Sequence, residues 1–149
     1  MLDGAMVDHD IMRATLARVM KEWDWPSTWG WDFPEIAMCA ARLGEGSAAI
    51  DALLMDTPKN TYLPNGHNRQ SDELPLYLPG NGGLLYAVAM MAAGWDGAPD
   101  VNAPGFSQDG SWMVRHEGLL PAPADYVGAD AEPSASSLRD TNVSLVDAQ

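Results

Sequence analysis

The sequence has a single cysteine, Cys39, so no disulfide can form within the chain. One thiol says nothing about an oxidising compartment. Cys39 lies among alanine and methionine residues, a setting typical of a buried thiol. The three histidines, His9, His67 and His116, are too far apart in sequence for a local metal-ligand motif. We therefore expect no metal site.

Basic residues are also scarce. Eight Lys and Arg stand against 21 Asp and Glu, which gives a formal net charge of −13. Phosphate binding depends on clustered Lys and Arg, so this balance argues against a nucleic-acid partner and against an anionic membrane surface. A neutral or cationic ligand remains compatible with it.

Long hydrophobic runs are missing as well. No apolar stretch approaches the roughly 18 residues of a membrane-spanning helix. Asp3, Asp8 and Asp10 stand where a signal peptide has a basic start and an apolar run. We expect neither a signal peptide nor a membrane span, and the sequence predicts no cellular location. Gly82 and Gly83 before an apolar helix resemble an anion-binding helix start, but the signal is weak because a P-loop lysine and a preceding strand pattern are missing. We expect no cofactor.

What the chain does contain is enough apolar material for one domain, 46% of 149 residues, with six Trp and nine Met. Residues 8–23 repeat apolar side chains at helical spacing, and Asp8 and Asp10 near the start favour a helix. Residues 23–31 contain four Trp and Pro26, which ends that helix. Such rings pack together or line a pocket.

A helical hairpin is predicted next. Asp32 and Glu35, with Pro34 between them, form a capping-box-like start for a helix over residues 32–43, and Gly44 follows it. Ser47 is the expected N-cap of a third helix, which carries Ile50, Leu53 and Leu54 on one side and is expected to end at residues 56–58. The short link predicts that the two helices pack antiparallel.

A long polar loop then runs into a nearly all-apolar helix. Residues 60–83 are rich in Tyr, Leu, Pro, Asn and Gly, and we expect an ordered loop over the mouth of a helical core. Residues 84–93 carry no polar face, so this fourth helix should be buried on all sides. Residues 111–117 fit one short strand, and residues 121–149 are predicted to be a disordered tail.

The fold class that follows is mainly α. Four helices leave the apolar fourth helix under-covered, which predicts an oligomer or a larger helical protein, with self-association through uncovered helix faces. Three blocks in this order then resemble a known family. They are Trp29-Gly30-Trp31-Asp32-Phe33-Pro34, Ala40-Ala41-Arg42-Leu43-Gly44 and residues 76–94.

These blocks resemble the C-terminal part of the catalytic domain of six-hairpin α/α-toroid glycosidases, nearest to the α-L-fucosidase type of glycoside hydrolase family 95. In that family a tryptophan-led helix ending in Ala-Arg-Leu-Gly precedes a loop with an Asp-Gly-Asn-Phe-Gly motif. The resemblance covers residues 7–120. It implies a partial toroid of helical hairpins over residues 1–120, a carbohydrate substrate, and a fragment of a glycoside hydrolase whose missing part would hold the general acid.

The chain departs from the family at Pro79, which stands where the motif has a carboxylate that helps to activate water. The resemblance then implies that the carboxylate lies elsewhere or that its role is lost. It also implies that Met1 is not a natural domain start, and that the chain alone is inactive or nearly so.

Glycoside hydrolysis usually needs two carboxyl groups. Asp32 is our candidate catalytic base or stabiliser, because it begins a helix directly after Trp29 and Trp31, whose faces suit a sugar ring. The expected sugar-contacting wall consists of Trp29, Trp31, Asn65, His67, Asn68 and Asn81.

Other interpretations remain open. Asp32 equally suits a helix N-cap, and Asn-Gly and Pro-Gly-Asn are ordinary turn formers. The chain can therefore be a non-catalytic helical module that binds carbohydrate or protein through aromatic anchors, or a truncated reading frame without a function. The discriminating feature is whether Asp32 shares a concave pocket with residues 65–68 or bonds to backbone amides.

Overall fold

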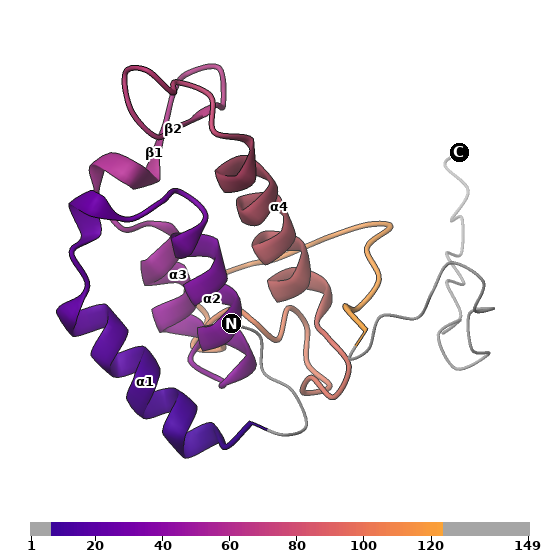
Figure 1. Ribbon diagram of the computed structural model, residues 1–149. Helices are drawn as coiled ribbons and strands as arrows, with labels where there is room; N and C mark the ends of the chain where they lie inside the picture. The colour runs from indigo at the N-terminus through magenta and orange to yellow at the C-terminus, as the bar shows by residue number, and fades with distance from the viewer. Residues whose placement is uncertain (1–6, 124–149) are drawn as a thin grey trace, which may run out of the picture.

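A computed structural model describes residues 7–123 of the chain, and this part is mainly helical, as the sequence predicts (Figure 1). Four α-helices surround a small core, and a two-stranded antiparallel hairpin rises from the loop before the last helix. The elements are α1 (His9–Glu22), η1 (Trp25–Ser27), α2 (Asp32–Arg42), α3 (Gly46–Leu53), η2 (Pro58–Asn60), β1 (Thr61–Tyr62), β2 (Asn68–Arg69) and α4 (Leu78–Ala93).

Helix α1 begins where the sequence places it. The Asp8 side chain accepts hydrogen bonds from the backbone N–H groups of Asp10 and Ile11, at 2.9 and 3.1 Å, and so acts as the N-cap. Only Met12 of this helix is buried, while Leu16 and Val19 are partly buried. Helix α1 therefore packs on the rest of the protein through one narrow stripe.

Helix α2 is the centre of the core, with α3 and α4 packed against it (Figure 1). All residues from 33 to 41 except Glu35 are buried. Ala37, Ala40 and Ala41 are fully covered, and their small side chains let the neighbouring helices approach closely. The predicted thiol burial is confirmed, since Cys39 is buried on the side that faces α1.

The predicted caps of α2 and α3 are wrong. Asp32 is already the first helical residue of α2, and the N-cap position is held by Trp31 without a side-chain bond. Helix α3 starts at Gly46 rather than after Ser47, and the Ser47 hydroxyl bonds to the Ser107 hydroxyl at 3.4 Å while Gly46 packs closely on the backbone of Phe106. A methyl group on Gly46 would lie 2.7 Å from the carbonyl carbon of Phe106. Long-range packing therefore decides this helix start.

Helix α4 is longer than predicted and less buried. It begins at Leu78 and includes Pro79 and the glycines that the sequence suggested were loop. Proline is tolerated in a first helical turn because its missing N–H has no partner there. The prediction that the helix is buried on all sides is wrong, since Leu85 is 73% exposed and Tyr86 is 53% exposed. Only one side of α4 packs on α2.

The predicted strand over residues 111–117 is also wrong. This segment is irregular, and among residues 7–123 the only sheet is the pair β1 and β2, with Thr61 opposite Arg69 and Tyr62 opposite Asn68. The Val114 carbonyl instead accepts a hydrogen bond from the Asn102 side chain at 3.0 Å. A strand over these residues would need the edge of another strand to pair with, and the hairpin of β1 and β2 lies elsewhere in the fold.

The segment after α4 returns to the core through Trp95. Ala122 N–H donates to the Gly94 carbonyl at 3.0 Å, and Asp96 N–H donates to the Ala122 carbonyl at 2.8 Å. The predicted disordered tail lies outside the described residues from residue 124 onward. Within the described part, every helix is too short or too polar to cross a bilayer.

Candidate functional site

The long loop is fastened by Asn68, which is fully buried. Its Nδ2 donates to the carbonyls of Lys59 and Thr61, at 3.3 and 3.4 Å. Its Oδ1 faces two glycines: a methyl group added to Gly30 would lie 2.0 Å from this oxygen, and one added to Gly80 would lie 2.3 Å from it. Asn68 therefore locks the loop between the segment before α2 and the start of α4, and has no surface to offer to a ligand.

Gln70 fastens the same loop to the tryptophan-rich segment. Its Oε1 accepts from Gly30 N–H at 2.9 Å, and its Nε2 donates to the Thr28 carbonyl at 3.1 Å. The buried side-chain amide of Gln70 thus pairs with one backbone group before Trp29 and one after it. These bonds fix the backbone that carries Trp29, whose side chain stays 48% exposed. No local pattern around Gln70 predicts this role.

Asn81 and Asn65 also hold the loop. Asn81 Oδ1 accepts from Asn68 N–H at 2.9 Å, and Asn81 Nδ2 donates to the Gly66 carbonyl at 2.7 Å. Asn65 Oδ1 accepts from His67 N–H at 3.1 Å, which is an Asx turn at the tip of the hairpin. These bonds favour the turn-forming interpretation over the sugar-binding one for both asparagines.

Two aromatic rings, Trp29 and Tyr77, lie beside the Asp32 carboxyl group where α2 begins, and we call these three residues the aromatic rim. The ring centroids of Trp29 and Tyr77 are 5.4 Å apart and the rings are tilted by 41°. Asp32 Oδ2 accepts from Trp29 N–H at 2.8 Å, so the carboxyl group is held beside the pair. Burial raises the pKa of the Tyr77 hydroxyl, and the nearby charge of Asp32 raises it further. The next tryptophan along the chain, Trp31, is 50% exposed.

The pKa of Asp32 is raised above its ordinary value of 3.8. Partial burial is the main cause, the charge of Glu35 adds to it, and the hydrogen bond from Trp29 N–H acts in the opposite direction. This carboxyl therefore holds a proton more readily than an exposed aspartate does. Such a group can serve in proton transfer, although structural carboxylates show similar shifts.

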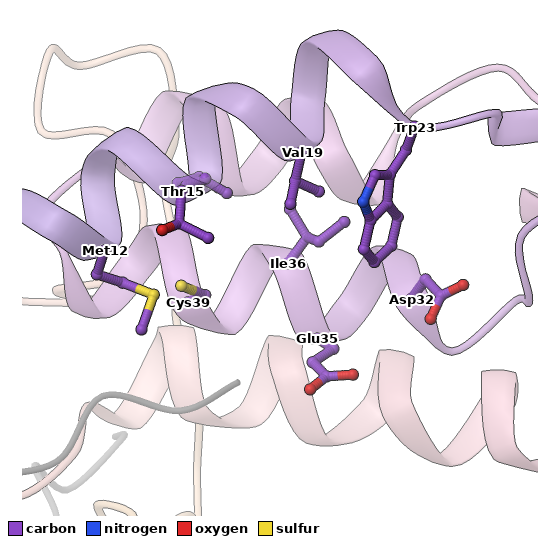
Figure 2. Close-up of a pocket in the computed structure, with 9 residues that line it drawn as sticks. Met12, Thr15, Val19, Trp23, Asp32, Glu35, Ile36 and Cys39 are labelled. Carbon is purple, nitrogen blue, oxygen red and sulfur yellow. The ribbon is translucent and has the colours of Figure 1, made fainter.

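Asp32 and Glu35 also line one end of a groove between α1 and α2, with a cavity volume of about 150 Å³. Figure 2 shows both carboxylates and Trp23 at this end, and Met12 and Cys39 towards the other. The walls are otherwise almost entirely apolar. None of the loop residues 65–68 lines it. The sequence left two arrangements open for Asp32: a pocket shared with residues 65–68, or a bond to a backbone amide. In the structure Asp32 bonds to the backbone amide of Trp29 and shares no pocket with residues 65–68.

The raised pKa of Asp32 gives a test of its surroundings. Its contribution to stability is full below the unfolded value near 3.8 and is lost as the pH rises through the higher folded pKa. An Asp32→Asn variant keeps an acceptor for Trp29 N–H but has no proton to lose. We expect the melting temperature of the variant, relative to wild type, to be higher at pH 7 than at pH 3.

Thermal unfolding of both proteins across this pH range measures the effect. Asp51→Asn, at an exposed position of α3, is the control for the loss of one negative charge. A relative melting temperature of Asp32→Asn that falls as the pH rises would show that Asp32 is stabilised as the anion, contrary to the burial argument.

The structure thus brings together only part of the predicted site. Trp29 and Asp32 meet at the aromatic rim with Tyr77, while Asn68 and Asn81 hold the loop and Asn65 forms its turn. Among residues 7–123 no three metal-binding side chains gather. Comparisons of the chain with protein-family models, with curated proteins and with solved structures give no match.

Proposed function

We propose that the aromatic rim contacts a saccharide, and that the chain is one segment of a larger helical protein related to glycoside hydrolases. One observation carries this proposal: Trp29 and Tyr77 lie 5.4 Å apart beside a carboxyl group that is held in place by a backbone N–H. Aromatic faces suit the apolar faces of sugar rings, and a carboxylate accepts hydrogen bonds from hydroxyl groups. Small-molecule sites commonly combine apolar walls with a few placed polar groups.

In this proposal Asp32 accepts a hydrogen bond from a sugar hydroxyl or, as a base in the larger protein, takes a proton from the water that attacks the glycosidic carbon. A raised pKa brings a carboxyl group closer to the pH at which it can exchange protons with a substrate. Hydrolysis of a glycoside needs a second carboxyl group across the scissile bond. Glu35 lies one turn further along α2, close enough to raise the pKa of Asp32. We assign the second catalytic carboxyl to another part of the larger protein, and expect this chain alone to bind without turnover.

The packing of the helices supports a larger helical assembly. Helices α2 and α3 pack as a hairpin, and large apolar side chains stay exposed on other helices: Ile11 of α1 is 67% exposed, and Leu54 at the end of α3 is 68% exposed. A toroid of hairpins, the architecture that the sequence blocks resemble, sets further hairpins beside such a unit. The partial toroid is thus the architecture we propose for this segment.

Replacing Trp29 with alanine tests the rim. Stacking contributes roughly 0.5–1.5 kcal/mol beyond area burial, so we expect oligosaccharide affinity to fall about tenfold. Chemical-shift titrations of the chain with a panel of soluble gluco-, manno-, xylo-, galacto- and fuco-oligosaccharides measure it. Trp112→Ala is the matched control, because Trp112 is 45% exposed and pairs with Phe106 at 5.7 Å, away from the rim.

The proposal fails if no oligosaccharide shifts the signals of Trp29 and Tyr77, or if Trp112→Ala weakens binding as much as Trp29→Ala. Aryl glycosides complete the experiment. Turnover by wild type that Asp32→Asn abolishes would show that the chain is a complete catalyst, against the segment part of the proposal.

A second candidate is a non-catalytic module that binds its partner through exposed aromatic side chains. It is favoured by one feature, the hydrogen bond that Asp32 already accepts from Trp29 N–H, which is the arrangement of a structural carboxylate. The two candidates differ in what Asp32→Asn does to saccharide binding at neutral pH. A module that uses only its rings keeps its affinity, whereas a site that uses the carboxylate as an acceptor loses affinity.

A further inference from the structure

The exposed face of α4 has an unusual composition for a soluble helix. Leu78, Gly82, Leu85 and Ala89 follow one another at spacings of four, three and four residues, so they form one stripe. Leu78 is 66% exposed and Leu85 is 73% exposed, and Tyr86 flanks them at 53%. A methyl group added to Gly82 would meet nothing within 4 Å, so the stripe is open at that point. Figure 1 shows α4 at the edge of the bundle.

The stripe alternates large and small side chains, and this alternation decides which partner fits. Two such helices in antiparallel orientation about a two-fold axis place Leu78 against the partner's Ala89, and Leu85 against the partner's Gly82. Each leucine then meets a small residue, as a knob meets a hole. In parallel orientation Leu85 would meet the partner's Leu85, and the two glycines would leave a gap. The face is therefore complementary to itself only when the helices run in opposite directions.

The charge distribution limits where a second copy of this chain can bind. The whole chain carries a net charge of −13, so two copies repel each other over most approaches. Helix α4 contains no acidic or basic residue from Leu78 to Ala93. Contact through this helix therefore places no charged side chain of α4 in the interface, and it removes exposed leucine side chains from water.

We propose that a second copy of the chain covers this face, and that the two α4 helices pack antiparallel about an axis between Gly82 and Leu85. The stripe runs over 12 residues, from Leu78 to Ala89, or about 17 Å of helix. This is short compared with interfaces that bury about 1,600 Å². The dimer is accordingly concentration-dependent. It involves none of the rim residues and holds whether or not the rim binds saccharide.

Sedimentation velocity of the full chain, from about 10 µM to about 1 mM, tests the proposal. Wild type is expected to shift from monomer to dimer over this range. Leu85→Glu should remain monomeric throughout, because two buried carboxylates would lie on the interface. Leu54→Glu is the matched control, since Leu54 is 68% exposed at the end of α3, and it should dimerise like wild type.

A size exchange tests the antiparallel pairing. A Cβ at Gly82 meets nothing within 4 Å in the monomer, but Gly82→Leu places a leucine against the partner's Leu85, so we expect dimer affinity to fall at least tenfold. Gly82→Leu combined with Leu85→Ala restores a large-to-small contact and should restore the dimer. Circular dichroism checks that each variant stays helical.

Three results would overturn the proposal. Wild type that stays monomeric to about 1 mM would assign the face of α4 to other helices of a longer protein. Equal loss of dimer in Leu54→Glu and Leu85→Glu would remove α4 from the interface. A Gly82→Leu dimer as tight as wild type would exclude the antiparallel pairing.

Discussion

Gly30→Ala is expected to destabilise the protein by about 3 kcal/mol, at the upper end of the usual cost of overpacking. The added methyl group would lie 2.0 Å from Oδ1 of Asn68. Asn68 has no free space to move into, because its side chain is fully buried and its backbone N–H and carbonyl are bonded to Asn81 and Tyr77. Gly80→Ala meets the same oxygen at 2.3 Å from the side of α4 and should show a similar loss.

Gly82→Ala is the matched control for this pair. Gly80 and Gly82 both lie in the first turns of α4, so helix propensity alone predicts a gain of roughly 0.5–1 kcal/mol for alanine at either position. Only Gly82 has open space around it. Denaturant unfolding should therefore give opposite signs for the two variants. Equal stability of Gly80→Ala and Gly82→Ala would show that Asn68 does not fasten the loop to α4.

Asn68→Asp is expected to cost about 3 kcal/mol or more at pH 7, although it changes one atom of the side chain. The Nδ2 group that donates to the carbonyls of Lys59 and Thr61 becomes an oxygen. Two carbonyl oxygens would then face a buried carboxylate, which raises the folded pKa of the new group. Protonation would supply an O–H donor for one of the carbonyls.

The loss should therefore be smallest below about pH 4, the unfolded pKa, and should grow as the pH rises through the folded pKa. Urea unfolding at several pH values measures it. Asn65→Asp is the isosteric control, because Asn65 is exposed and an aspartate also forms an Asx turn. We expect that variant to remain within about 0.5 kcal/mol of wild type. Equal effects at Asn65 and Asn68 would contradict the role given to the buried amide.

The helices could be predicted because their signals are local. Apolar spacing and the Asp8 cap locate α1, and Pro34 with two acidic residues in the first turn and Gly44 after the end locate α2. The start of α4 was missed because glycine and proline favour loops in isolation. In the folded chain Gly80 packs on Asn68, and a methyl group on Gly83 would lie 2.7 Å from Cγ of Pro34. Contacts between distant segments thus outweigh the local preference at this helix start.

In the candidate site too, contacts between residues close in sequence could be predicted, and contacts between distant segments could not. Trp29 and Asp32 are three residues apart, and their proximity follows from the chain itself. The partner ring of Tyr77 and the bonds from Gln70 come from the long loop, with Tyr77 48 residues after Trp29 and Gln70 40 residues after Gly30. Asn65 precedes Gly66, an ordinary turn signal, but nothing around Asn68, which stands between His67 and Arg69, predicts that its side chain is fully buried. Only the folded chain reveals the role of Asn68.

The single thiol gives the molecule a built-in reporter of partial opening. Cys39 lies beneath α1, in contact with Met12 and Leu43, and α1 itself buries only one residue. Detachment of that one helix would uncover the sulfur while α2, α3 and α4 remain packed together. The rate at which a thiol reagent modifies the native chain therefore measures how often α1 lifts away, separately from global unfolding.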